Sequence, residues 1–418
     1  MTILDRLPAP SATRLAVRVT PDAARHVRAG HPWIFDNSIR SVNRDGAPGD
    51  LAVVFDDDRQ FLAIGLWDPH SLIRLKVLHH GRPATVDAAF FRSRLTTALE
   101  RRVSLTTSSG DQTTTGYRIV HGENDGLPGL VVDRYGHVGV VKLYSAAWIP
   151  HLAVIVPLLI ELLPVSSLVL RLARSMAEQE LYGLSEGMSL HGPDVDRPVE
   201  FLELGLKFEA DVIHGQKTGY FLDQRENRAL VRDAAKGARV LDVFCCTGGF
   251  SVHAAAGGAR SAHGIDSSPF AIQAAERNMQ RNQNNASVAA CRFETTVGEA
   301  FAELERLAES RGRFDIVVVD PPSFARAAIN VPRAITAYER LAALAVTLVE
   351  RDGMLVQASC SSRVDEVDFV RAVHAGAGRS GFDLEEIRRT GHAVDHPIGF
   401  TEGAYLKAVF ARPHRRAK

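Results

Sequence analysis

The segment that decides the fold is residues 240–250, which read VLDVFCCTGGF. Its apolar first half is typical of a buried strand that carries Asp242 to its end, and a helix is expected to follow. Between strand and helix, Thr247, Gly248 and Gly249 form a tight turn. Glycine is favoured where backbone approaches a ligand closely, because a Cβ atom would collide with that ligand. The turn lacks the G-x-G-x-x-G spacing of dinucleotide sites, so we predict an adenosyl amino acid as its ligand, with an ordinary glycine turn as the alternative.

A second expected strand ends at Asp266, about 20 residues past the glycine turn. Ser268 and Pro269 follow it with the pattern of a helix cap and a first helical residue. An acidic side chain at this point is placed to accept hydrogen bonds from both hydroxyls of a ribose. The alternative is that Asp266 only caps the helix. The order and spacing of the two strand ends favour a shared cofactor site.

A glutamate before another expected helix is the third candidate contact to the cofactor. Residues 297–301 read VGEAF, and Glu299 stands where an acidic side chain would contact the amine of an adenine ring. The alternative is a surface glutamate at the start of a helix. Glu299 is therefore predicted to bind the cofactor, and this prediction rests only on its position in the sequence.

The segment FDIVVVDPPSF, residues 314–324, is expected to carry the substrate site. Asp320 follows an apolar strand, and the two prolines after it fix the backbone and remove two hydrogen-bond donors. The carbonyl groups and the Asp320 carboxylate are therefore held stiffly as acceptors for the exocyclic amine or the ring edge of a nucleobase. A turn of this composition also occurs without such a role, but its position after a buried strand favours the functional interpretation.

The next expected strand, MLVQAS, places Cys360 at its tip, beside Asp320 if the strands follow the usual order. A thiolate there can add to C6 of a pyrimidine, so that C5 becomes electron-rich enough to take a methyl group from a sulfonium. A buried and inert cysteine is the alternative. Cys245 and Cys246 are expected to pack against the cofactor, and Cys291 is expected in the core of a strand.

The order of the expected elements indicates an α/β protein with several domains. After Gly215, short β-branched runs alternate with helical segments near residues 269–281 and 334–350, which predicts a parallel sheet wrapped by helices, with its ligand site at the carboxyl ends of the strands. Residues 14–78 consist of short alternating runs, typical of a small all-β barrel or sandwich, and a mixed α+β module follows. The predicted domains are residues 1–82, 83–198 and 199–418.

Composition limits the classes of function and the compartment. The 49 basic and 49 acidic residues balance, so contact with RNA requires local basic patches. Four cysteines are too few and too clustered for a disulfide framework and lack the spacing of a zinc site, so we expect a reducing, cytoplasmic location and no bound metal. The first ten residues do not resemble a secretory signal, and polar residues and prolines interrupt the most apolar stretch, residues 148–163, so no membrane span is predicted.

With these residues assembled, the chain resembles the bacterial 23S rRNA cytosine-5 methyltransferases that carry an N-terminal PUA domain. The likeness runs from about Arg14 to Phe410. Its motifs are GHPWIF at residues 30–35, VHGENDGLPGLVVDR at 120–134, GQKTGYFLDQR at 215–225, and then His396-Pro, Glu402-Gly and Tyr405-Leu-Lys407.

The resemblance implies a Rossmann-like class I methyltransferase domain with a mostly parallel seven-stranded sheet that binds S-adenosylmethionine, preceded by a PUA-like β-barrel and a small central α+β domain. It also implies that residues of the 215–225 motif shape the cofactor pocket and that Cys360 is the nucleophile, with Asp320 as the second catalytic residue. The predicted cofactor contacts are Asp242, Phe244, Thr247, Gly248, Gly249, Asp266, Ser267, Glu299, Asp320, Lys217, Tyr220, Asp223 and Gln224. The predicted substrate contacts are Pro321, Pro322, Ser323, Phe324 and Arg225.

The chain departs from the family pattern at three places. Many members have lysine where this chain has Ser323, which removes a charge that could touch RNA phosphate. The adenine position is usually aspartate, and here it is Glu299. The cytosine methyltransferases with two motif cysteines have one beside the aspartate, whereas here Cys360 would have to serve for both attack and release. These differences concern the target nucleotide more than the fold.

Three functions follow from these patterns. The leading hypothesis is methyl transfer to C5 of a cytosine in large-subunit ribosomal RNA, with the base flipped out of its stack. A second keeps the cofactor but methylates an amine or a ring nitrogen directly, and a third is a non-catalytic RNA-binding assembly factor. The partner is large-subunit rRNA in each case, and a homodimer is one expected assembly. The basic residues expected to hold phosphates are Arg25, Arg28, Arg40, Arg412, Arg415, Arg416 and Lys418, with a merely solvated terminus as the alternative for the last four.

Overall fold

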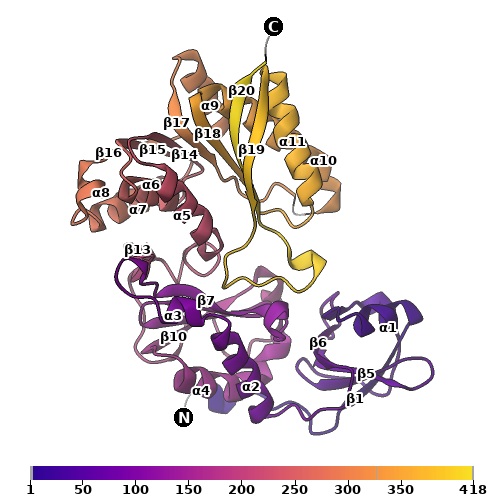
Figure 1. Cartoon of the computed structure of the whole chain (residues 1–418). Coiled ribbons are helices and arrows are strands. Elements are labelled where there is room, and N and C mark those ends of the chain that lie inside the picture. The colour runs from indigo at the N-terminus through magenta and orange to yellow at the C-terminus, as the bar shows by residue number, and fades with distance from the viewer. Residues whose placement is uncertain (1–2, 326, 417–418) are drawn as a thin grey trace. The chain divides into compact units, whose positions relative to one another are not determined.

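The computed structural model describes residues 3–325 and 327–416, and the chain forms two compact units (Figure 1). Unit 1 consists of Met1–Leu202, Ala210–Phe221 and Val394–Phe400. Unit 2 consists of Glu203–Glu209, Leu222–Ala393 and Thr401–Lys418. Each unit is therefore built from separate stretches of the sequence, and the catalytic candidates Asp320 and Cys360 both belong to unit 2.

The N-terminal part of unit 1 is a mixed sheet with a core of its own. Its strands are, in spatial order, β2 (Trp33–Ile34), β6 (Leu75–His80), β5 (Phe61–Trp67), β4 (Leu51–Phe55), β1 (Leu15–Val19) and β3 (Ile39–Val42). The prediction of strands over residues 14–78 is confirmed, but the all-β prediction is wrong because α1 (Pro21–Arg28) lies between β1 and β2. Thr20 caps that helix by accepting a hydrogen bond from the Ala23 N–H at 3.3 Å, and Pro21 starts it.

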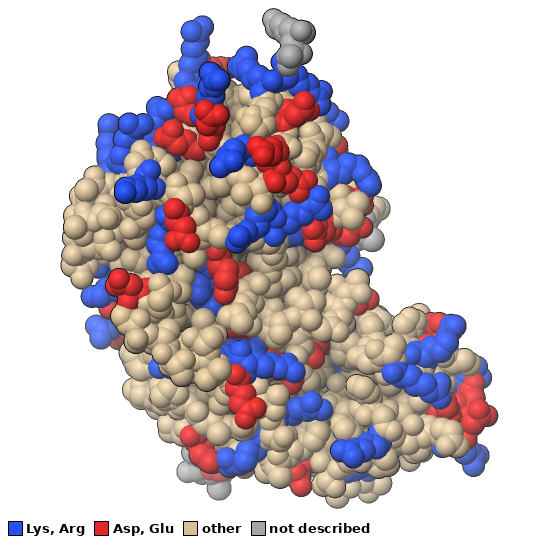
Figure 2. All heavy atoms as spheres, in the orientation of Figure 1, with Lys and Arg blue, Asp and Glu red and all other residues tan. Residues whose placement is uncertain are grey.

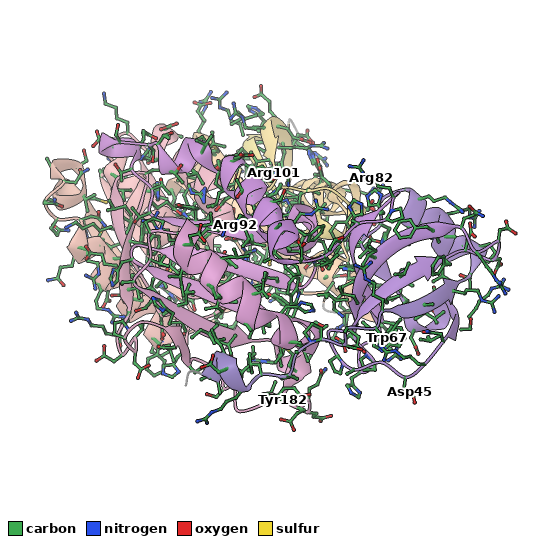
Figure 3. All side chains as sticks on the ribbon, turned by 90° about the horizontal axis from the view of Figure 1, so that it is seen from below. Asp45, Trp67, Arg82, Arg92, Arg101 and Tyr182 are labelled. Atoms are coloured by element: carbon green, nitrogen blue, oxygen red, sulfur yellow. The ribbon has the colours of Figure 1, made fainter. Side chains whose placement is uncertain are left out.

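The rest of unit 1 is a second sheet covered by helices. Its strands are, in order, β11 (Ser189–His191), β10 (Ser167–Leu172), β9 (Val138–Leu143), β8 (Leu130–Tyr135) and β7 (Gly116–His121), and its helices are α2 (Ala88–Glu100), α3 (Val103–Thr106) and α4 (Leu152–Leu162). Arg92 of α2, which Figure 3 labels, pairs with Glu161 of α4 at 2.6 Å. Trp148, just before α4, is fully buried among the apolar side chains of this core.

Unit 2 is built on a seven-stranded sheet. Its strands are, in order, β16 (Arg292–Val297), β15 (Ser261–Asp266), β14 (Arg239–Val243), β17 (Phe314–Val319), β18 (Val349–Ser359), β20 (Lys407–Arg415) and β19 (Phe382–Thr390). The first five strands are parallel, and β20 and β19 are antiparallel to their neighbours. The predicted mostly parallel seven-stranded sheet is confirmed. A two-stranded sheet of β12 (Val199–Glu203) and β13 (Leu206–Ala210) lies where the chain passes from unit 1 to unit 2.

Helices cover both faces of the unit 2 sheet. They are α5 (Arg225–Ala234), α6 (Gly249–Ala256), α7 (Pro269–Arg281), α8 (Ala286–Ala290), α9 (Ala300–Glu309), α10 (Val331–Ala345) and α11 (Glu366–Arg379). Successive side chains of a strand point to opposite faces. Leu241 and Val243 of β14 therefore pack in the core that α9 and α10 contribute to, while Asp242 points to the α6 side and binds Ser251.

Two helix predictions in this half can be compared with the structure. The helix predicted near residues 269–281 is confirmed as α7, whose start is fixed by the Ser268 cap and Pro269. The helix predicted near residues 334–350 is α10, which ends earlier, at Ala345, because β18 already begins at Val349. No helix in residues 3–325 or 327–416 combines the length and the apolar character needed to cross a lipid bilayer.

Candidate functional site

The carboxyl ends of the parallel strands of unit 2 bring three predicted site segments to one edge of the sheet. Asp266 ends β15, Asp320 directly follows β17, and Cys360 directly follows β18. Because β17 and β18 are neighbours, the Cys360 Sγ lies 3.7 Å from the carbonyl oxygen of Pro321. The predicted position of Cys360 beside the 320–322 turn is confirmed.

The turn after β14 has a strained backbone. Phe244, Cys246 and Gly248 have φ angles of +64°, +48° and +75°, a region that non-glycine residues rarely adopt. The Cys245 N–H donates to the Ile265 carbonyl at 2.9 Å, which ties the turn to β15. Strain of this kind persists only where the surroundings hold it, and it concentrates at functional sites.

Gly248 is required by the protein's own packing. A Cβ atom at this position would lie 2.8 Å from the Cβ of Ala275 in α7. This contact with Ala275 is a reason for the glycine that the sequence did not show, and the close approach of a ligand at this turn stays a prediction. The glycine allows α6 and α7 to lie close together at the turn, and it supplies the left-handed conformation at the start of α6.

Asp242 is fully buried and anchors the start of α6. Its Oδ2 accepts hydrogen bonds from the backbone N–H of Ser251 at 3.0 Å and from the Ser251 hydroxyl at 2.7 Å. Its Oδ1 has no hydrogen-bond partner among the residues that the structure describes. Burial raises the pKa of Asp242 to about 6, against the opposing effect of the bonds from Ser251. Ser251 was missed in the sequence analysis, although a serine early in the helix is a visible signal.

Asp266 is half-buried, and both of its carboxylate oxygens are oriented. Oδ2 accepts from the Cys246 N–H at 3.0 Å, and Oδ1 accepts from the Ser268 N–H at 2.9 Å. The helix cap is Ser268 and not Asp266, because the Ser268 hydroxyl accepts from the Ala271 N–H at 3.3 Å. Each oxygen of an ionised carboxylate can accept a further hydrogen bond, so the pair of oxygens fits a ribose diol. Ser267, exposed at the same point, lies beside it.

Glu299 is exposed and caps α9. Its Oε2 accepts a hydrogen bond from the Ala302 N–H at 3.0 Å. This is the helix-start role that the sequence analysis held as the alternative. A carboxylate that caps a helix still has a second oxygen, so the contact between Glu299 and an adenine amine stays a prediction.

The 215–225 motif is divided between the two units. In unit 1, the Lys217 carbonyl accepts from Lys142 Nζ at 2.8 Å, and the Tyr220 ring packs on Phe201 with 5.0 Å between ring centroids. In unit 2, the buried Asp223 accepts from the Tyr405 hydroxyl at 2.8 Å.

The two residues that follow in the motif are also buried in unit 2. The Gln224 Oε1 accepts from Asn227 at 2.6 Å, and Arg225 is buried at the start of α5. The roles of the motif in binding cofactor and substrate stay predictions.

The surroundings of the three cysteines other than Cys360 raise the pKa of each thiol. Burial, with Asp266 as the next contribution, raises the pKa of Cys246 to about 12. Burial and then Asp242 raise the pKa of Cys245 well above its usual value. Burial also raises the pKa of Cys291, which lies at the end of α8 and not inside a strand as predicted. At neutral pH these three side chains are thiols, not nucleophilic thiolates.

A network of hydroxyl groups surrounds the turn that begins at Cys360. The Tyr338 hydroxyl of α10 lies 2.8 Å from the Ser359 hydroxyl and 2.9 Å from that of Ser361. The Ser361 hydroxyl is also 3.1 Å from that of Ser323, in the segment after the two prolines. Sequence analysis missed Tyr338, because the helix that carries it lies between the two motifs in the sequence. The network connects the two strand ends that hold the predicted catalytic residues.

Among the predicted substrate contacts, Pro322 is exposed, whereas Pro321 is buried. Ser323 and Phe324 are half-buried, and the Phe324 ring packs on Tyr338 with 5.2 Å between centroids. The turn therefore offers one exposed ring and a stiff backbone to a ligand.

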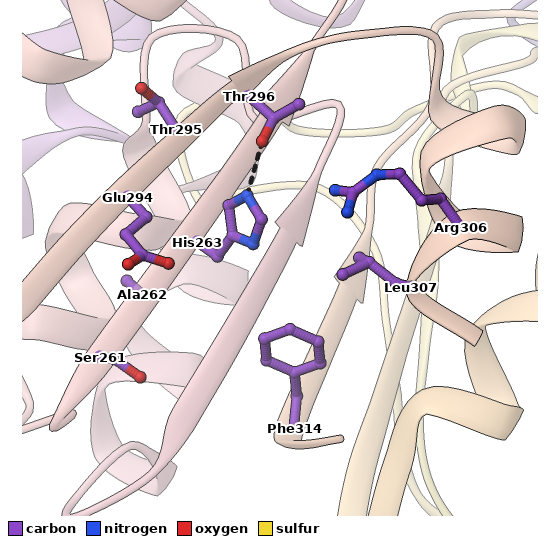
Figure 4. Close-up of a pocket in the computed structure, with 9 residues that line it drawn as sticks. All are labelled: Ser261, Ala262, His263, Glu294, Thr295, Thr296, Arg306, Leu307 and Phe314. Atoms are coloured by element: carbon purple, nitrogen blue, oxygen red, sulfur yellow. Dashed lines mark hydrogen bonds between the residues drawn. The ribbon is translucent and has the colours of Figure 1, made fainter. Parts of the chain in front are cut away.

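A separate hollow of about 560 Å³ lies where β15 and β16 meet α9 (Figure 4). Its lining residues are Ser261, Ala262, His263, Glu294, Thr295, Thr296, Arg306, Leu307 and Phe314. His263 Nε2 and Thr296 Oγ1 lie 2.9 Å apart, and burial lowers the pKa of His263. No predicted cofactor or substrate contact is among these lining residues, so this hollow is not the predicted site.

Charges of both signs are interspersed over the face shown in Figure 2, as the balanced composition predicts. Several arginines that were expected to hold phosphates form ion pairs: Arg25 with Asp22, Arg28 with Asp56, Arg40 with Asp57 and Arg416 with Asp383. Exposed ion pairs are weak, so these side chains stay available to phosphate. Lys418 lies outside the described residues. The described part of the chain contains no cluster of acidic, histidine and cysteine side chains suited to a metal ion.

The fold and this edge define a Rossmann-like, S-adenosylmethionine-dependent methyltransferase. A family model described as S-adenosylmethionine-dependent methyltransferase matches residues 161–382, and a model described as a PUA-like domain matches residues 17–80. The chain is 46% identical over 407 residues to the "Ribosomal RNA large subunit methyltransferase" of Deinococcus radiodurans, across 96% of this chain and 98% of the relative. It is 34% identical to the "Ribosomal RNA large subunit methyltransferase I" of Shewanella frigidimarina, across 95% and 99% of the two chains. The chain belongs to the ribosomal RNA large subunit methyltransferase family.

Solved structures agree with the fold. A chain from Streptococcus mutans that was assigned as a SAM-dependent methyltransferase matches with a TM-score of 0.79 at 19% identity, over 95% of this chain and 99% of that one. A second structure, of a chain assigned as a methyltransferase and complexed with SAH, gives the same values. The expected combination of a PUA-like part and a methyltransferase part in an α/β protein is thus confirmed.

Proposed function

We propose that this enzyme transfers a methyl group from S-adenosylmethionine to C5 of a cytosine in 23S rRNA, through a covalent adduct between Cys360 and C6 of the base. The observation that carries the proposal is the position of the thiol. The Cys360 Sγ lies 3.7 Å from the carbonyl oxygen of Pro321, at the same sheet edge as the Asp266 carboxylate. A nucleophile, a stiff row of acceptors and a candidate ribose contact therefore stand at neighbouring strand ends.

The proposed reaction uses Cys360 twice. Its thiolate forms a bond to C6, and the electron pair of the C5–C6 double bond makes C5 nucleophilic. S-adenosylmethionine supplies the methyl group that C5 takes. C5 then loses its proton to solvent, the electron pair of the C5–H bond restores the C5–C6 double bond, and the bond between C6 and Sγ breaks to release the thiolate. Because prolines and serine follow Asp320, no second cysteine stands beside it to share these steps.

Asp320 and the Pro321 carbonyl serve the substrate in this proposal. Prolines on the C-terminal side of Asp320 remove two backbone donors, so the backbone at this point offers acceptors to a base. The amine at C4 of cytosine is a donor, and acceptors in fixed positions hold the ring with C6 toward Cys360. Uracil has a carbonyl group at C4, which is itself an acceptor and cannot donate a hydrogen bond to these groups. We therefore expect uracil to bind less well than cytosine.

The proposed cofactor contacts are centred on the first two strand ends. Asp266 accepts hydrogen bonds from the ribose hydroxyls, with Ser267 beside it, and Glu299 accepts from the adenine amine. Phe244, Thr247, Gly248 and Gly249 line the cofactor as part of the turn. Asp242 acts indirectly, because its carboxylate is fully buried and holds the start of α6 through Ser251. Lys217, Tyr220 and the 223–225 segment complete the predicted contacts.

The RNA substrate is inferred from the family. The relatives from Deinococcus radiodurans and Shewanella frigidimarina are named as ribosomal RNA large subunit methyltransferases, and the family match at residues 17–80 is to a PUA-like domain. The division into domains at residues 1–82, 83–198 and 199–418 and a homodimer belong to the same proposal. Mass-spectrometric mapping of methylated nucleosides in 23S rRNA, from cells with and without the gene, tests the product. A missing 5-methylcytosine is expected, and an unchanged 5-methylcytosine profile would contradict the proposal.

The covalent route is tested with Cys360→Ala. We expect methyl transfer to fall by at least about 1000-fold, because the base can no longer be activated by addition at C6. The affinity for S-adenosylmethionine, measured by calorimetry, should be unchanged. Cys291→Ala is the matched control, because this cysteine lies at the end of α8, and it should retain its activity. Activity in Cys360→Ala equal to that of the control would contradict the covalent route.

The same measurements separate the two other hypotheses. Direct methylation of an amine or ring nitrogen would leave Cys360→Ala active and would place the methyl group on nitrogen. An assembly factor without catalysis would show no binding of S-adenosylmethionine in the wild-type protein. The oriented oxygens of Asp266 favour a working cofactor site over the latter.

A further inference from the structure

A buried lysine is attached to the turn that begins at Cys360. Lys407 starts β20 and is paired with Ser359, the last residue of β18. Its side chain is almost completely buried, and its Nζ donates to the carbonyl oxygen of Ser361 at 2.6 Å and to that of Val364. The ammonium group therefore binds the backbone of the turn directly behind the predicted nucleophile.

Among the residues that the structure describes, no carboxylate forms an ion pair with the ammonium group of Lys407. Other buried cations of unit 2 do form such a pair, as Arg228 shows by its double contact with Glu203 at 2.7 Å. Within residues 3–325 and 327–416, Lys407 makes its hydrogen bonds to backbone carbonyl groups and forms no ion pair. A buried charge without an opposite charge is costly, so the site favours an anion nearby.

The charged and titratable groups that face this lysine are few. Cys360 is the first among those whose negative charge would stabilise the ammonium, ahead of Asp365 and Glu366 at the start of α11. Burial outweighs them and lowers the pKa of Lys407 to about 8. Asp320 and the Tyr338 hydroxyl share the surroundings of Cys360, and burial raises the pKa of Tyr338. Lys407 is thus a buried cation close enough to Cys360 for the two charges to interact.

We propose that Lys407 is a positioning residue for the reaction: its ammonium group stabilises the thiolate of Cys360 and fixes the turn that carries it. This inference rests on the proposed function, since it assigns the counter-charge of the nucleophile. It concerns the state of the thiol before RNA binds. The proton that leaves Cys360 goes to solvent, and Lys407 stays protonated as the thiolate forms. The ion pair thereby supplies the opposite charge that the buried ammonium lacks.

The rate at which iodoacetamide alkylates Cys360 tests the proposal on the full-length enzyme without RNA. Peptide mapping by mass spectrometry separates Cys360 from the other three cysteines across a pH series. An ordinary thiol titrates near pH 8.5. We expect the midpoint for Cys360 in the wild-type enzyme to lie below that value, by about one pH unit or more. A midpoint at or above the ordinary value would overturn the proposal without any variant.

Two variants refine the test. Lys407→Met keeps the length of the side chain but removes its charge, and we expect alkylation of Cys360 at pH 7 to become about 10-fold slower or more. Lys407→Arg keeps the charge and should recover part of that rate. Lys236→Met is the control, because Lys236 is exposed after α5. A Lys407→Met enzyme with lowered thermal stability and an unchanged alkylation midpoint would overturn the electrostatic role.

The alkylation assay tests the role of Lys407, and the methylation assay tests the covalent route, so either proposal can be contradicted without the other. Methyl transfer retained in Cys360→Ala would remove the covalent route, whatever the thiol titration shows. A normal thiol titration with activity lost in Cys360→Ala would remove the role of Lys407 and leave the covalent route in place. In the expected case, the pH profile of methyl transfer in Lys407→Met shifts upward together with the alkylation midpoint.

Discussion

Cysteines follow two strands of the same sheet, and they differ in the charged groups that bind the turns carrying them. Cys246, in the turn after β14, is close to carboxylates: its own N–H binds Asp266, and burial with that carboxylate raises the pKa of its thiol to about 12. Cys360, after β18, lies near the buried Lys407, which holds the carbonyl groups of the same turn. Both residues are half-buried, so exposure does not distinguish them.

The charges around a strand end therefore decide whether a cysteine at that end is reactive; the presence of the cysteine alone does not. Carboxylates orient backbone donors and bind hydroxyl groups, so the end of β14 suits a neutral or cationic ligand such as a sulfonium nucleoside. A cation without a carboxylate partner suits an anionic nucleophile. Binding and chemistry are thus separated between two strand ends, and the following predictions test that separation.

The largest expected effect is on a trapped adduct. RNA that carries 5-fluorocytidine cannot lose a proton from C5, so the enzyme should remain bonded to it through Sγ. We expect Cys360→Ser to form no adduct on a denaturing gel, a loss of at least about 1000-fold, because a serine hydroxyl is a far weaker nucleophile. Cys246→Ser should still form it. An adduct that is lost in Cys246→Ser and kept in Cys360→Ser would show that Cys246 is the nucleophile, and it would contradict the proposed roles of the two cysteines.

The next largest effect concerns the packing of Gly248 in the turn after β14. Gly248→Ala should lower the free energy of unfolding by about 3 kcal/mol, because a left-handed alanine is strained and its Cβ would meet Ala275 at 2.8 Å. Gly237→Ala is a matched control with a φ of +72° and open space around the new Cβ, so it should cost only about 1 kcal/mol. Urea unfolding measures both, and equal losses would contradict the packing argument.

The buried Asp242 predicts a dependence of stability on pH. Its pKa in the folded state is about 6, above the ordinary value of 3.8, so the folded protein holds this proton more tightly than the unfolded chain does. The stabilisation is complete below about pH 4 and is lost as the pH rises to about 6, on the order of 3 kcal/mol. Asp242→Asn should remove this slope in urea unfolding between pH 4 and pH 7. The idea fails if wild type and variant respond to pH in the same way.

The smallest effect concerns Asp266. Asp266→Asn should weaken binding of S-adenosylmethionine about 10-fold in calorimetry, because an amide replaces one acceptor by a donor at the ribose. Loss of the carboxylate should also speed the alkylation of Cys246 by iodoacetamide, while that of Cys360 stays the same. If both thiols responded equally, the two strand ends would not be electrostatically separate.

The sheet and its edge were predictable from local sequence. Parallel strands share one carboxyl edge, so residues that end or directly follow such strands, as Asp266, Asp320 and Cys360 do, lie at that edge. Helix α7 was predictable to the residue because Ser268 and Pro269 fix its start. The glycine turn already predicted an adenosyl amino acid, and the resemblance to a known family added the PUA-like part and the role of the 215–225 motif.

The remaining features depend on long-range pairing. Lys407 reaches the turn after β18 because β20 is antiparallel to β18 and brings Lys407 opposite Ser359. The pairing of two distant strands cannot be read from either segment of the sequence alone. One signal was present: a lysine directly before the apolar run AVFA is unusual at the start of a buried strand. The packing reason for Gly248 could not be predicted, because its neighbour Ala275 lies on another helix.

The short stretch Val394–Phe400 has a consequence for how the molecule is made. It belongs to unit 1, where Asp395 accepts from the Arg118 N–H at 2.7 Å and its carbonyl accepts from Arg102 at 2.9 Å. Yet it is synthesised after six of the seven strands of the large sheet. Unit 1 is therefore completed only after most of the large sheet has been synthesised. A gene cut before residue 394 would remove the two acceptors that Asp395 provides, one for the backbone N–H of Arg118 and one for the buried side chain of Arg102.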